Sequence, residues 1–362
     1  MKDGVVLLDD NAVEVLSYWD LRAGAWQTVG FVAGNLDGVS RPIMRIGDAR
    51  YVLRHQPPDL TENDTLFRHA FMRHLTTAGA LPIPPLLPRP DGHTYAVVED
   101  GIYELQGWRD GGHYVSGDPE EDDEMESAAR TLGRLHQASA DFAWQPHIWS
   151  GDRSAAALAQ AYCALIRERS GAAGLPESVA AGLARVADTC DERLDAAVEA
   201  LEGGARPPEL HIHGDYQPHN LGFTGGEVSV IYDFDAARWE RRVDELAYAL
   251  LYFTGVRWDE RPTITPPLVS DGLDVPRVQR FLAAYGDEAP PAEGEARLLA
   301  DALALIFPIV FANGVAEDLI FPDDYDAAPD EADALARLHW ADTFWLWLDR
   351  YRPTLAEAWE SA

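Results

Sequence analysis

The chain has 362 residues, 61 acidic and 29 basic, and a formal net charge of −32 at pH 7. With 47% hydrophobic and 10% aromatic residues it is predicted to be a packed globular protein, which excludes a disordered acidic chain. So strong a negative field repels phosphate backbones and anionic lipids, so we expect no nucleic-acid partner and no membrane partner. Lys2 is the only lysine, which excludes a Gly-Lys-Ser/Thr phosphate loop and a Schiff-base lysine within the fold.

Cysteine usage and apolar stretches bear on the compartment. Cys163 and Cys190 are too few for a disulfide framework or a thiolate zinc site, and they indicate a reducing compartment. The N-terminus carries acids where a signal peptide has a basic and then a long apolar stretch. The longest apolar run, residues 302–316, contains Pro308 and is shorter than the ~20 residues that span a bilayer, so it is predicted to be a buried helix. We therefore expect a cytoplasmic protein.

The first 108 residues are predicted to form a small mixed sheet with two helices. Alternating apolar residues and glycine-rich connections predict strands at 26–32, 39–46, 51–56, 95–98 and 102–108. Apolar spacing near 3.6 predicts helices at 11–21 and 60–78.

From residue 109 the composition shifts toward alanine, leucine and arginine, and helical patterns dominate. Helices are predicted at 125–139, 154–169, 179–201, 276–285, 295–311 and 331–351. Pro276 is expected at the first position of its helix, where its missing N–H costs nothing. The shift in composition predicts two domains, residues 1–108 and 109–362.

A tight turn is predicted to bring polar side chains together after residue 220. The glycines at 225–226 favour a two-residue hairpin loop. Thr224 then pairs with Glu227, and counting back sets Asn220 opposite Ile231. Because side chains alternate between faces with period two, one face is expected to carry Asn220, Ile231, Asp233 and Asp235.

This placement suggests phosphate chemistry. Asp233 would sit about 7 Å along its strand from the residue facing Asn220. An amide oxygen and a carboxylate so placed can share Mg²⁺, which prefers oxygen ligands and the phosphates of a nucleotide. Asp215 lies five residues before Asn220, where it suits a base that accepts a proton from a substrate hydroxyl. The alternative is a polar turn in which Asp215 caps the next segment.

Residues 213–235 resemble the aminoglycoside phosphotransferase and choline kinase-like family, and the resemblance extends over nearly the whole chain. It implies a protein-kinase-like fold of class α+β, with a small mixed antiparallel-sheet N-terminal lobe and a large helical C-terminal lobe. It also implies that Asp215 is the catalytic base and that Asn220 and Asp233 bind magnesium. Tyrosine replaces the isoleucine of the family's Ile-Asp-Phe-Asp pattern, and Asp235 matches the second acid, a further candidate metal ligand.

The N-terminal lobe departs from the family at informative places. Arg54 fills the position of a lysine that contacts the nucleotide phosphates, and an arginine is always charged and binds phosphate in a fork. The family's next helix often carries a glutamate that pairs with this cation. Arg68 stands at that place, so Glu62 or Asp64 is expected to pair with Arg54 instead.

Two further segments resemble nucleotide-binding parts of the family. The loop with Gly34 and Asn35 resembles a turn whose N–H groups cover the phosphates, although a plain hairpin is the alternative. Residues 103–108, with Gln106 and Trp108, resemble the hinge whose backbone groups would bind adenine. The implied cofactors are ATP, with GTP possible, and Mg²⁺.

Other residues that draw attention have structural interpretations. His136 lies on a helix that resembles the family's packing helix, and Asp244 begins a segment that resembles a structural Asp-Leu-Ala motif. For both we expect structural roles. An acidic, aromatic substrate pocket could be formed by nearby acids with Trp239, Trp258, Trp340, Trp345 and Trp347. However, the spacing of Trp340, Phe344 and Trp347 favours the core stripe of a helix.

The sequence thus predicts an ATP- and Mg²⁺-dependent phosphotransferase acting on the hydroxyl of a small molecule. The predicted substrate is an antibiotic (aminoglycoside, macrolide or nucleoside), which phosphorylation would inactivate by adding bulk and negative charge. One alternative is a metabolic kinase for homoserine, an amino alcohol or a sugar. Another is a kinase-like protein that binds a nucleotide without turnover, which Arg54 and Arg68 favour and the intact Asp215 and Asn220 oppose.

Overall fold

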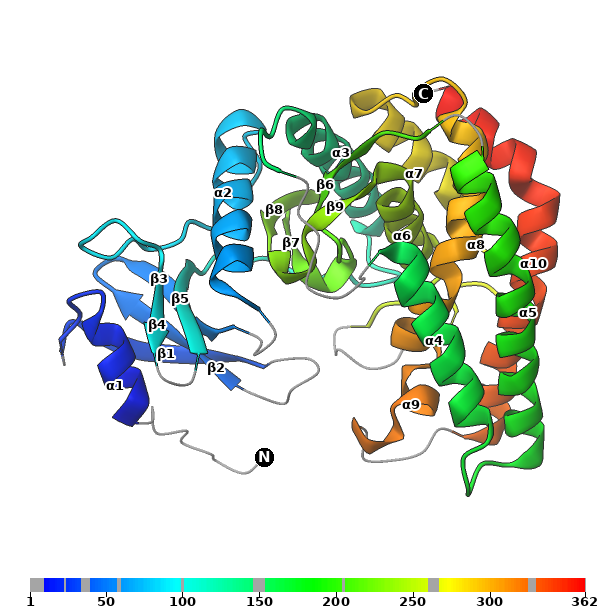
Figure 1. Ribbon diagram of the computed structural model, residues 1–362, viewed down its shortest axis with the longest axis horizontal. Helices are drawn as coiled ribbons and strands as arrows, with labels where there is room; N and C mark the ends of the chain where they lie inside the picture. Colours follow the sequence, from blue (N-terminus) through cyan, green and yellow to red (C-terminus); the bar gives the residue numbers. More distant parts are fainter. Residues whose placement is uncertain are drawn as a thin grey trace. The chain divides into compact units, whose positions relative to one another are not determined.

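The computed structural model describes residues 10–22, 24–33, 40–56, 60–98, 101–145, 154–203, 206–259, 267–324 and 330–361. The chain divides into two compact units (Figure 1). The first comprises Met1–Arg73 and Pro82–Asp110, and the second His74–Leu81 and Gly111–Ala362.

The first unit contains a five-stranded antiparallel sheet in the order β1-β2-β3-β5-β4. Its strands are β1 (Trp26–Ala33), β2 (Ser40–Ile46), β3 (Ala49–His55), β4 (Tyr95–Val98) and β5 (Gly101–Gly107). Its helices are α1 (Asp10–Ser17) and the part of α2 (Glu62–Ala78) up to Arg73. These elements confirm the predicted strands and helices, with α1 ending earlier than expected.

The two faces of this sheet differ in chemistry because side chains alternate along β3 and β5. On one face Leu53 and Leu105, which are register partners, pack with Leu16 and Trp19 from the α1 region. On the other face Arg54 stands opposite Glu104, toward the side chains of α2. The sheet therefore carries an apolar core on one side and a buried charged cluster on the other.

The second unit is mostly helical. Its helices are α3 (Glu121–Ala140), α4 (Ala155–Ser170), α5 (Glu177–Gly203), α6 (Arg242–Thr254), α7 (Val275–Glu288), α8 (Leu299–Val310), α9 (Glu317–Ile320) and α10 (Glu331–Glu360). Its strands form two antiparallel pairs, β6 (Glu209–Ile212) with β9 (Arg238–Arg241) and β7 (Leu221–Thr224) with β8 (Glu227–Ile231). The pairing of β6 with β9 brings the segments that follow Ile212 and precede Arg238 side by side.

Helix α8 is the core helix of this unit and packs against α4, α5, α6 and α10 (Figure 1). Short helical turns extend it at both ends, so the helical stretch Glu295–Val315 has 21 residues and a mean hydropathy of 2.0 in its most apolar window. By length and composition this stretch could cross a membrane, because it is longer than the apolar run 302–316 on which the expectation rested. However, 83% of that window is buried inside the protein, which confirms the predicted buried helix.

The aromatic residues of α10 confirm the core interpretation. Trp340, Phe344 and Trp347 are 1%, 0% and 7% exposed. The rings of Trp340 and Phe344 pack on Phe307 of α8, with centroids 5.7 and 4.4 Å away. The indole N–H of Trp340 donates to the carbonyl oxygen of Gly272 at 2.7 Å. These rings therefore stabilise the packing of α10 on α8.

Several elements differ from the sequence-based expectation. Helix α10 continues through Pro353 to Glu360. Helix α7 begins at Val275, so Pro276 is its second residue and not its first. Helix α6 and strands β6 and β9 were not predicted. In α6 all residues but one are buried, so no amphipathic period marks it.

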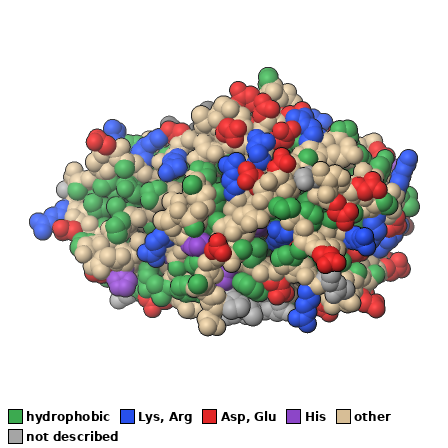
Figure 2. Space-filling model, turned by 90° about the horizontal axis from the view of Figure 1, so that it is seen from above, with side chains coloured by type: hydrophobic (Ala, Val, Ile, Leu, Met, Phe, Trp, Pro, Cys, Tyr) green, Lys and Arg blue, Asp and Glu red, His purple; other side chains and the backbone are tan. Residues whose placement is uncertain are grey.

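Some surface arginines in this acidic chain form ion pairs with acids. Arg167 bonds both Asp188 and Asp191, and Arg193 forms a two-point contact with Asp349 at 2.8 Å. Figure 2 shows acidic and basic side chains interspersed on the face in view. Exposed pairs of this kind contribute little to stability.

Candidate active site

The loop between β6 and β7 presents Asp215, and Gly214 gives the loop its shape. Gly214 has φ +85°, and a Cβ there would lie 2.0 Å from the carbonyl oxygen of Ala236. Only glycine fits both constraints. The guanidinium of Arg238 reinforces this approach by donating to the carbonyl oxygens of Gly214 and Ala236, at 3.4 and 3.2 Å.

Glu245 of α6 anchors the backbone of this loop. Its carboxylate accepts hydrogen bonds from the N–H groups of His213 and Gly214, and it contacts His136 Nε2 at 2.8 Å. Burial alone would raise the pKa of Glu245, but the hydrogen bond and charge of His136 hold that pKa below its usual range. The other ring nitrogen of His136 lies 2.7 Å from the Tyr285 hydroxyl. A buried anion therefore fixes the loop.

These contacts agree with the structural role expected for His136. Asp244 also has a structural contact, because its carboxylate accepts from Arg241 Nε at 2.7 Å. The sequence pattern drew attention to Asp244, whereas its neighbour Glu245, which anchors the loop, was not predicted. The sequence signal was the acid directly before Leu246 and Ala247, which stands at the aspartate position of the Asp-Leu-Ala motif.

Asp215 is enclosed by hydrogen-bond donors. Its Oδ1 accepts from the hydroxyl of Tyr248 and from Gln217 Nε2 at 2.9 Å, and its Oδ2 accepts from Asn220 Nδ2 at 2.7 Å. Asn220 Nδ2 also donates to the backbone oxygen of Asp215 at 2.9 Å. Because Asp215 engages the amide nitrogen of Asn220, the amide oxygen is directed away from Asp215. The structure thus brings two of the predicted site residues into direct contact.

Asp233 lies beside Asn220, but not for the reason the sequence predicted. Strand β8 ends at Ile231, and a register shift between Gly222 and Phe223 makes Leu221 the partner of Ile231. The predicted pairing of Asn220 with Ile231 is therefore wrong, although Thr224 does pair with Glu227. The turn count could not reveal a bulge, which adds one residue to one strand.

Backbone contacts produce the juxtaposition instead. Asn220 ends a short 3₁₀ turn that begins at Pro218, and its carbonyl oxygen accepts from the N–H of Tyr232 at 2.8 Å. Asp233 follows Tyr232 directly, in the left-handed conformation with φ 60°. Asp235 lies in the next 3₁₀ turn, so neither acid belongs to a strand face. The left-handed conformation of Asp233 is uncommon for a residue other than glycine and is often associated with a functional site.

His213 fixes this acidic segment against the loop. Its Nε2 lies 2.7 Å from the carbonyl oxygen of Tyr232, and its ring centroid is 4.4 Å from that of Phe234. Asp233 therefore sits between two residues that contact the same buried histidine. The amide oxygen of Asn220 and the carboxylates of Asp233 and Asp235 are oxygen donors, a set that fits Mg²⁺ and not a softer metal. Among the described residues, no three His, Cys, Asp or Glu side chains form a metal-binding group by themselves.

The first unit holds Arg54 in a buried charged cluster. Arg54 Nη1 lies 3.2 Å from Glu104 Oε1, and Arg68 Nη2 lies 2.6 Å from Glu104 Oε2. His69 Nε2 contacts the same oxygen at 2.7 Å. Burial would raise the pKa of Glu104, but Arg68 and His69 dominate and hold it far below its usual range. Glu104 is therefore the ionised centre of this cluster.

The structure pairs Arg54 with an acid that was not among those expected. Asp64 accepts from the N–H and hydroxyl of Thr61 at the start of α2, at 2.7 and 2.6 Å. The carboxylate found on Arg54 is Glu104, which comes from β5 and not from the helix. The sequence missed Glu104 because the cross-strand register of β3 and β5, which sets it opposite Arg54, depends on tertiary pairing.

The remaining predicted nucleotide-binding residues fall in three places. Gln106 is 4% exposed, and its Oε1 lies 3.4 Å from Arg54 Nη1, so its side chain belongs to the charged cluster. The N–H of Trp108 was predicted to belong to the hinge. It donates to the carbonyl oxygen of Arg50 in β3 at 2.7 Å, so it is already engaged within the sheet. Gly34 and Asn35 lie outside the described residues.

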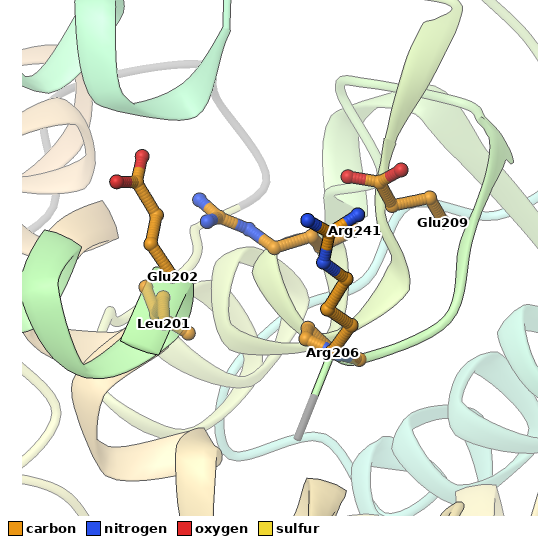
Figure 3. Close-up of a pocket in the computed structure, with 6 residues that line it drawn as sticks. Leu201, Glu202, Arg206, Glu209 and Arg241 are labelled. Carbon is orange, nitrogen blue, oxygen red and sulfur yellow. The ribbon is translucent and has the colours of Figure 1, made fainter. Parts of the chain in front are cut away.

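A surface hollow of about 450 Å³ lies elsewhere in the second unit (Figure 3). It is lined by Leu201, Glu202, Arg206, Pro207, Glu209 and Arg241. Glu209 pairs with Arg241 at one end of the β6–β9 ladder, whereas the loop to Asp215 leaves from Ile212 at the other end. This hollow is therefore not the site around Asp215.

The sequence matches the model of the phosphotransferase enzyme family over residues 34–299, well over half of the chain. No curated protein matches it significantly. The chain belongs to the phosphotransferase enzyme family, whose members transfer phosphoryl groups.

Solved structures agree on the fold. The chain resembles an amicoumacin kinase in complex with AMP-PNP, Ca²⁺ and Ami (TM-score 0.60, 13% identity, covering 96% of this chain and 93% of that one). It also resembles an aminoglycoside phosphotransferase from Alicyclobacillus acidocaldarius (0.61, 17%, 96% of each chain). A third similar structure is a choline/ethanolamine kinase family protein from Mesorhizobium loti (0.59, 14%, 98% and 100%). At these identities the likeness establishes the fold, which confirms the predicted two-lobed, protein-kinase-like α+β class.

We predict that Gly214→Ala destabilises the protein by more than about 2 kcal/mol, because it adds a clash with Ala236 to the strain of positive φ. Gly225→Ala is the matched control, since Gly225 has φ +58° and nothing within 4 Å of a built Cβ. It should cost only about 1 kcal/mol. Urea unfolding of both variants measures the difference, and equal losses would contradict the role of the Ala236 contact.

We also predict a pH signature of Glu245. Its pKa lies below 4.5 in the folded state, so the unfolded chain binds more protons near that pH, and stability falls as pH drops through 4.5. Glu245→Gln should be less stable than the native chain at pH 7 but should lose less stability between pH 6 and pH 3. Urea midpoints across this range test the prediction, and parallel curves for the two proteins would refute it.

Proposed function

We propose that this protein is an ATP- and Mg²⁺-dependent O-phosphotransferase that phosphorylates a hydroxyl group of a small molecule. The observation that carries the proposal is the contact of Asp215 with Asn220, beside Asp233, on a loop whose backbone is fixed by Glu245. Residues 1–108 would form the nucleotide-binding domain and residues 109–362 the catalytic and substrate-binding domain. The cytoplasm would suit its two buried free cysteines.

Asp215 would act as the general base. Its carboxylate accepts the proton of the substrate hydroxyl while the oxygen of that hydroxyl forms a bond to the γ-phosphorus of ATP. The bond from that phosphorus to the bridging oxygen breaks, and its electron pair leaves with ADP. The hydrogen bonds on Asp215 orient it before the substrate arrives, which lowers the cost of reaching the reactive geometry.

Asn220 and Asp233 would hold the metal, with Asp235 as a further ligand. When bound, Mg²⁺ neutralises the charge of the phosphate oxygens and fixes their orientation. The hydrogen bonds from Asn220 Nδ2 to Asp215 leave its Oδ1 as the ligand atom. One side chain thus would tie the base to the metal.

Arg54 would bind the nucleotide phosphates in place of lysine. Arg54 and Arg68 both contact Glu104 in the buried cluster. Arg54 is its most exposed charged member, at 14% against 2% for Arg68 and 1% for Glu104. Its guanidinium is therefore the charged group of the cluster that is best placed to meet an anionic phosphate.

For the substrate we propose an antibiotic, which would make the protein a resistance enzyme. The similar structures include an amicoumacin kinase and an aminoglycoside phosphotransferase. The alternative is a metabolic small-molecule kinase, since an aminopropanol kinase is also similar, with a TM-score of 0.58. An ADP-release screen over antibiotics, amino alcohols, homoserine and sugars, with mass spectrometry for the phosphate adduct, distinguishes the two classes.

We predict that Asp215→Asn lowers kcat at least about 1000-fold, because the amide cannot accept the proton. Nucleotide affinity and the thermal midpoint should stay close to those of the native chain. Near-native turnover would exclude Asp215 as the base. If the native chain binds ATP but phosphorylates no member of the screen, the nucleotide-binding alternative without turnover is favoured.

We predict that Arg54→Gln weakens ATP binding about tenfold or more, because a charged bidentate donor to phosphate is lost. Arg193→Gln is the control, since this arginine forms an exposed pair with Asp349 in the other unit. Isothermal titration with ATP measures both. Unchanged affinity in Arg54→Gln would refute phosphate binding by Arg54.

A further inference from the structure

Tyr248 has a distinctive place on α6. Of the residues of this helix, Tyr248 alone is only partly buried, and its hydroxyl donates to Asp215 Oδ1. Its ring packs edge-on against Tyr252, with centroids 4.8 Å apart, and Tyr252 is 1% exposed. Tyr248 therefore reaches the site from a rigid support.

The same helix holds both the backbone and the side chain of the loop. Glu245 accepts from the N–H groups of His213 and Gly214, and Tyr248 lies three residues later, so both project from one side of α6. One contact fixes where the loop runs, and the other fixes how the carboxylate of Asp215 is turned. This arrangement couples the orientation of Asp215 to a packed helix.

Counting lone pairs distinguishes the two oxygens of Asp215. A carboxylate oxygen accepts about two hydrogen bonds. Among the described residues, Oδ1 accepts from Tyr248 and Gln217, so its capacity is filled, whereas Oδ2 accepts only from Asn220. The remaining position for an incoming hydroxyl is on Oδ2, the oxygen that Asn220 also contacts.

The direction of the proton in the Tyr248–Asp215 contact is settled by electrostatics. Burial raises the pKa of Tyr248 well above its usual value, and the charge of Asp215 raises it further. Tyr248 therefore remains protonated and acts as a donor. It cannot compete with Asp215 for the substrate proton.

We propose that Tyr248 is a positioning residue that, with Gln217, occupies Oδ1 of Asp215 and makes Oδ2 the atom that receives the substrate proton. This inference rests on the proposed phosphotransfer function. Without Tyr248, Oδ1 gains a free lone pair and the carboxylate loses one of its three fixed contacts. The hydroxyl can then approach either oxygen, and fewer encounters have the reactive geometry.

The test compares Tyr248→Phe with the native chain in steady-state kinetics, using a substrate identified by the ADP-release screen. We expect kcat to fall about tenfold, the effect of one hydrogen bond to a charged group, with KM unchanged for both ATP and the substrate. The control is Tyr216→Phe, because the buried Tyr216 hydroxyl donates to the carbonyl oxygen of Ala128 at 2.9 Å and not to Asp215. It should lower the thermal midpoint and leave kcat near native.

The outcomes separate this inference from its premise. A native chain that phosphorylates nothing overturns the proposed function and, with it, this inference. A native chain that is active while Tyr248→Phe keeps kcat within twofold overturns the inference alone. So does a raised KM for the substrate with unchanged kcat, which would make Tyr248 a binding group.

A second variant covers the case in which Tyr248→Phe does not fold. Gln217→Ala removes the other donor to Oδ1 from a partly exposed loop position. We expect kcat to fall about threefold at constant KM, because one of the two donors to Oδ1 is lost while Tyr248 still holds it. An unchanged kcat in this variant would overturn the inference.

Discussion

A single buried carboxylate organises the candidate active site of this phosphotransferase. Glu245 accepts hydrogen bonds from two consecutive N–H groups of the loop and is balanced by His136, so the backbone before Asp215 is fixed. A buried anion is tolerable only with such complete compensation, and the removal of any partner would leave a costly charge. The positions of Asp215, Asn220 and Asp233 depend on this anchoring.

In the first unit, the buried charges that need compensation are cations. Arg54 on β3 needs a fixed counter-ion, and α2 carries a second cation, Arg68, where the family resemblance led us to expect an acid. Glu104 on β5 compensates for both, because it is the register partner of Arg54 and lies within 2.6 Å of Arg68. The arrangement keeps Glu104 ionised and leaves Arg54 more exposed than Arg68. The arginine at position 68, where an acid was expected, is thus compensated by Glu104 on β5.

Much of the fold followed from residue patterns. Periodicity located all five strands of the first sheet and six helices of the second unit, and the Gly225-Gly226 turn was placed correctly. Helix α6 was not predicted because it is buried on nearly every side, so its sequence does not alternate between a buried apolar face and an exposed polar face. The strand-face argument for Asp233 failed at a bulge, although Asp233 does follow the residue bonded to Asn220. These errors arise where backbone geometry departs from a regular repeat.

By itself, the sequence determined the kind of chemistry. The residues that indicate this chemistry lie within one short segment: Asp215, Asn220, Asp233 and Asp235. Their spacing can therefore be recognised in the sequence. The partners of these residues come from distant segments: Glu245 and Tyr248 from α6, His136 from α3 and Glu104 from β5. Only tertiary packing decided which donors reach Asp215 and which acid holds Arg54, because hydrogen bonds between elements depend on where the chain folds back and not on residue order.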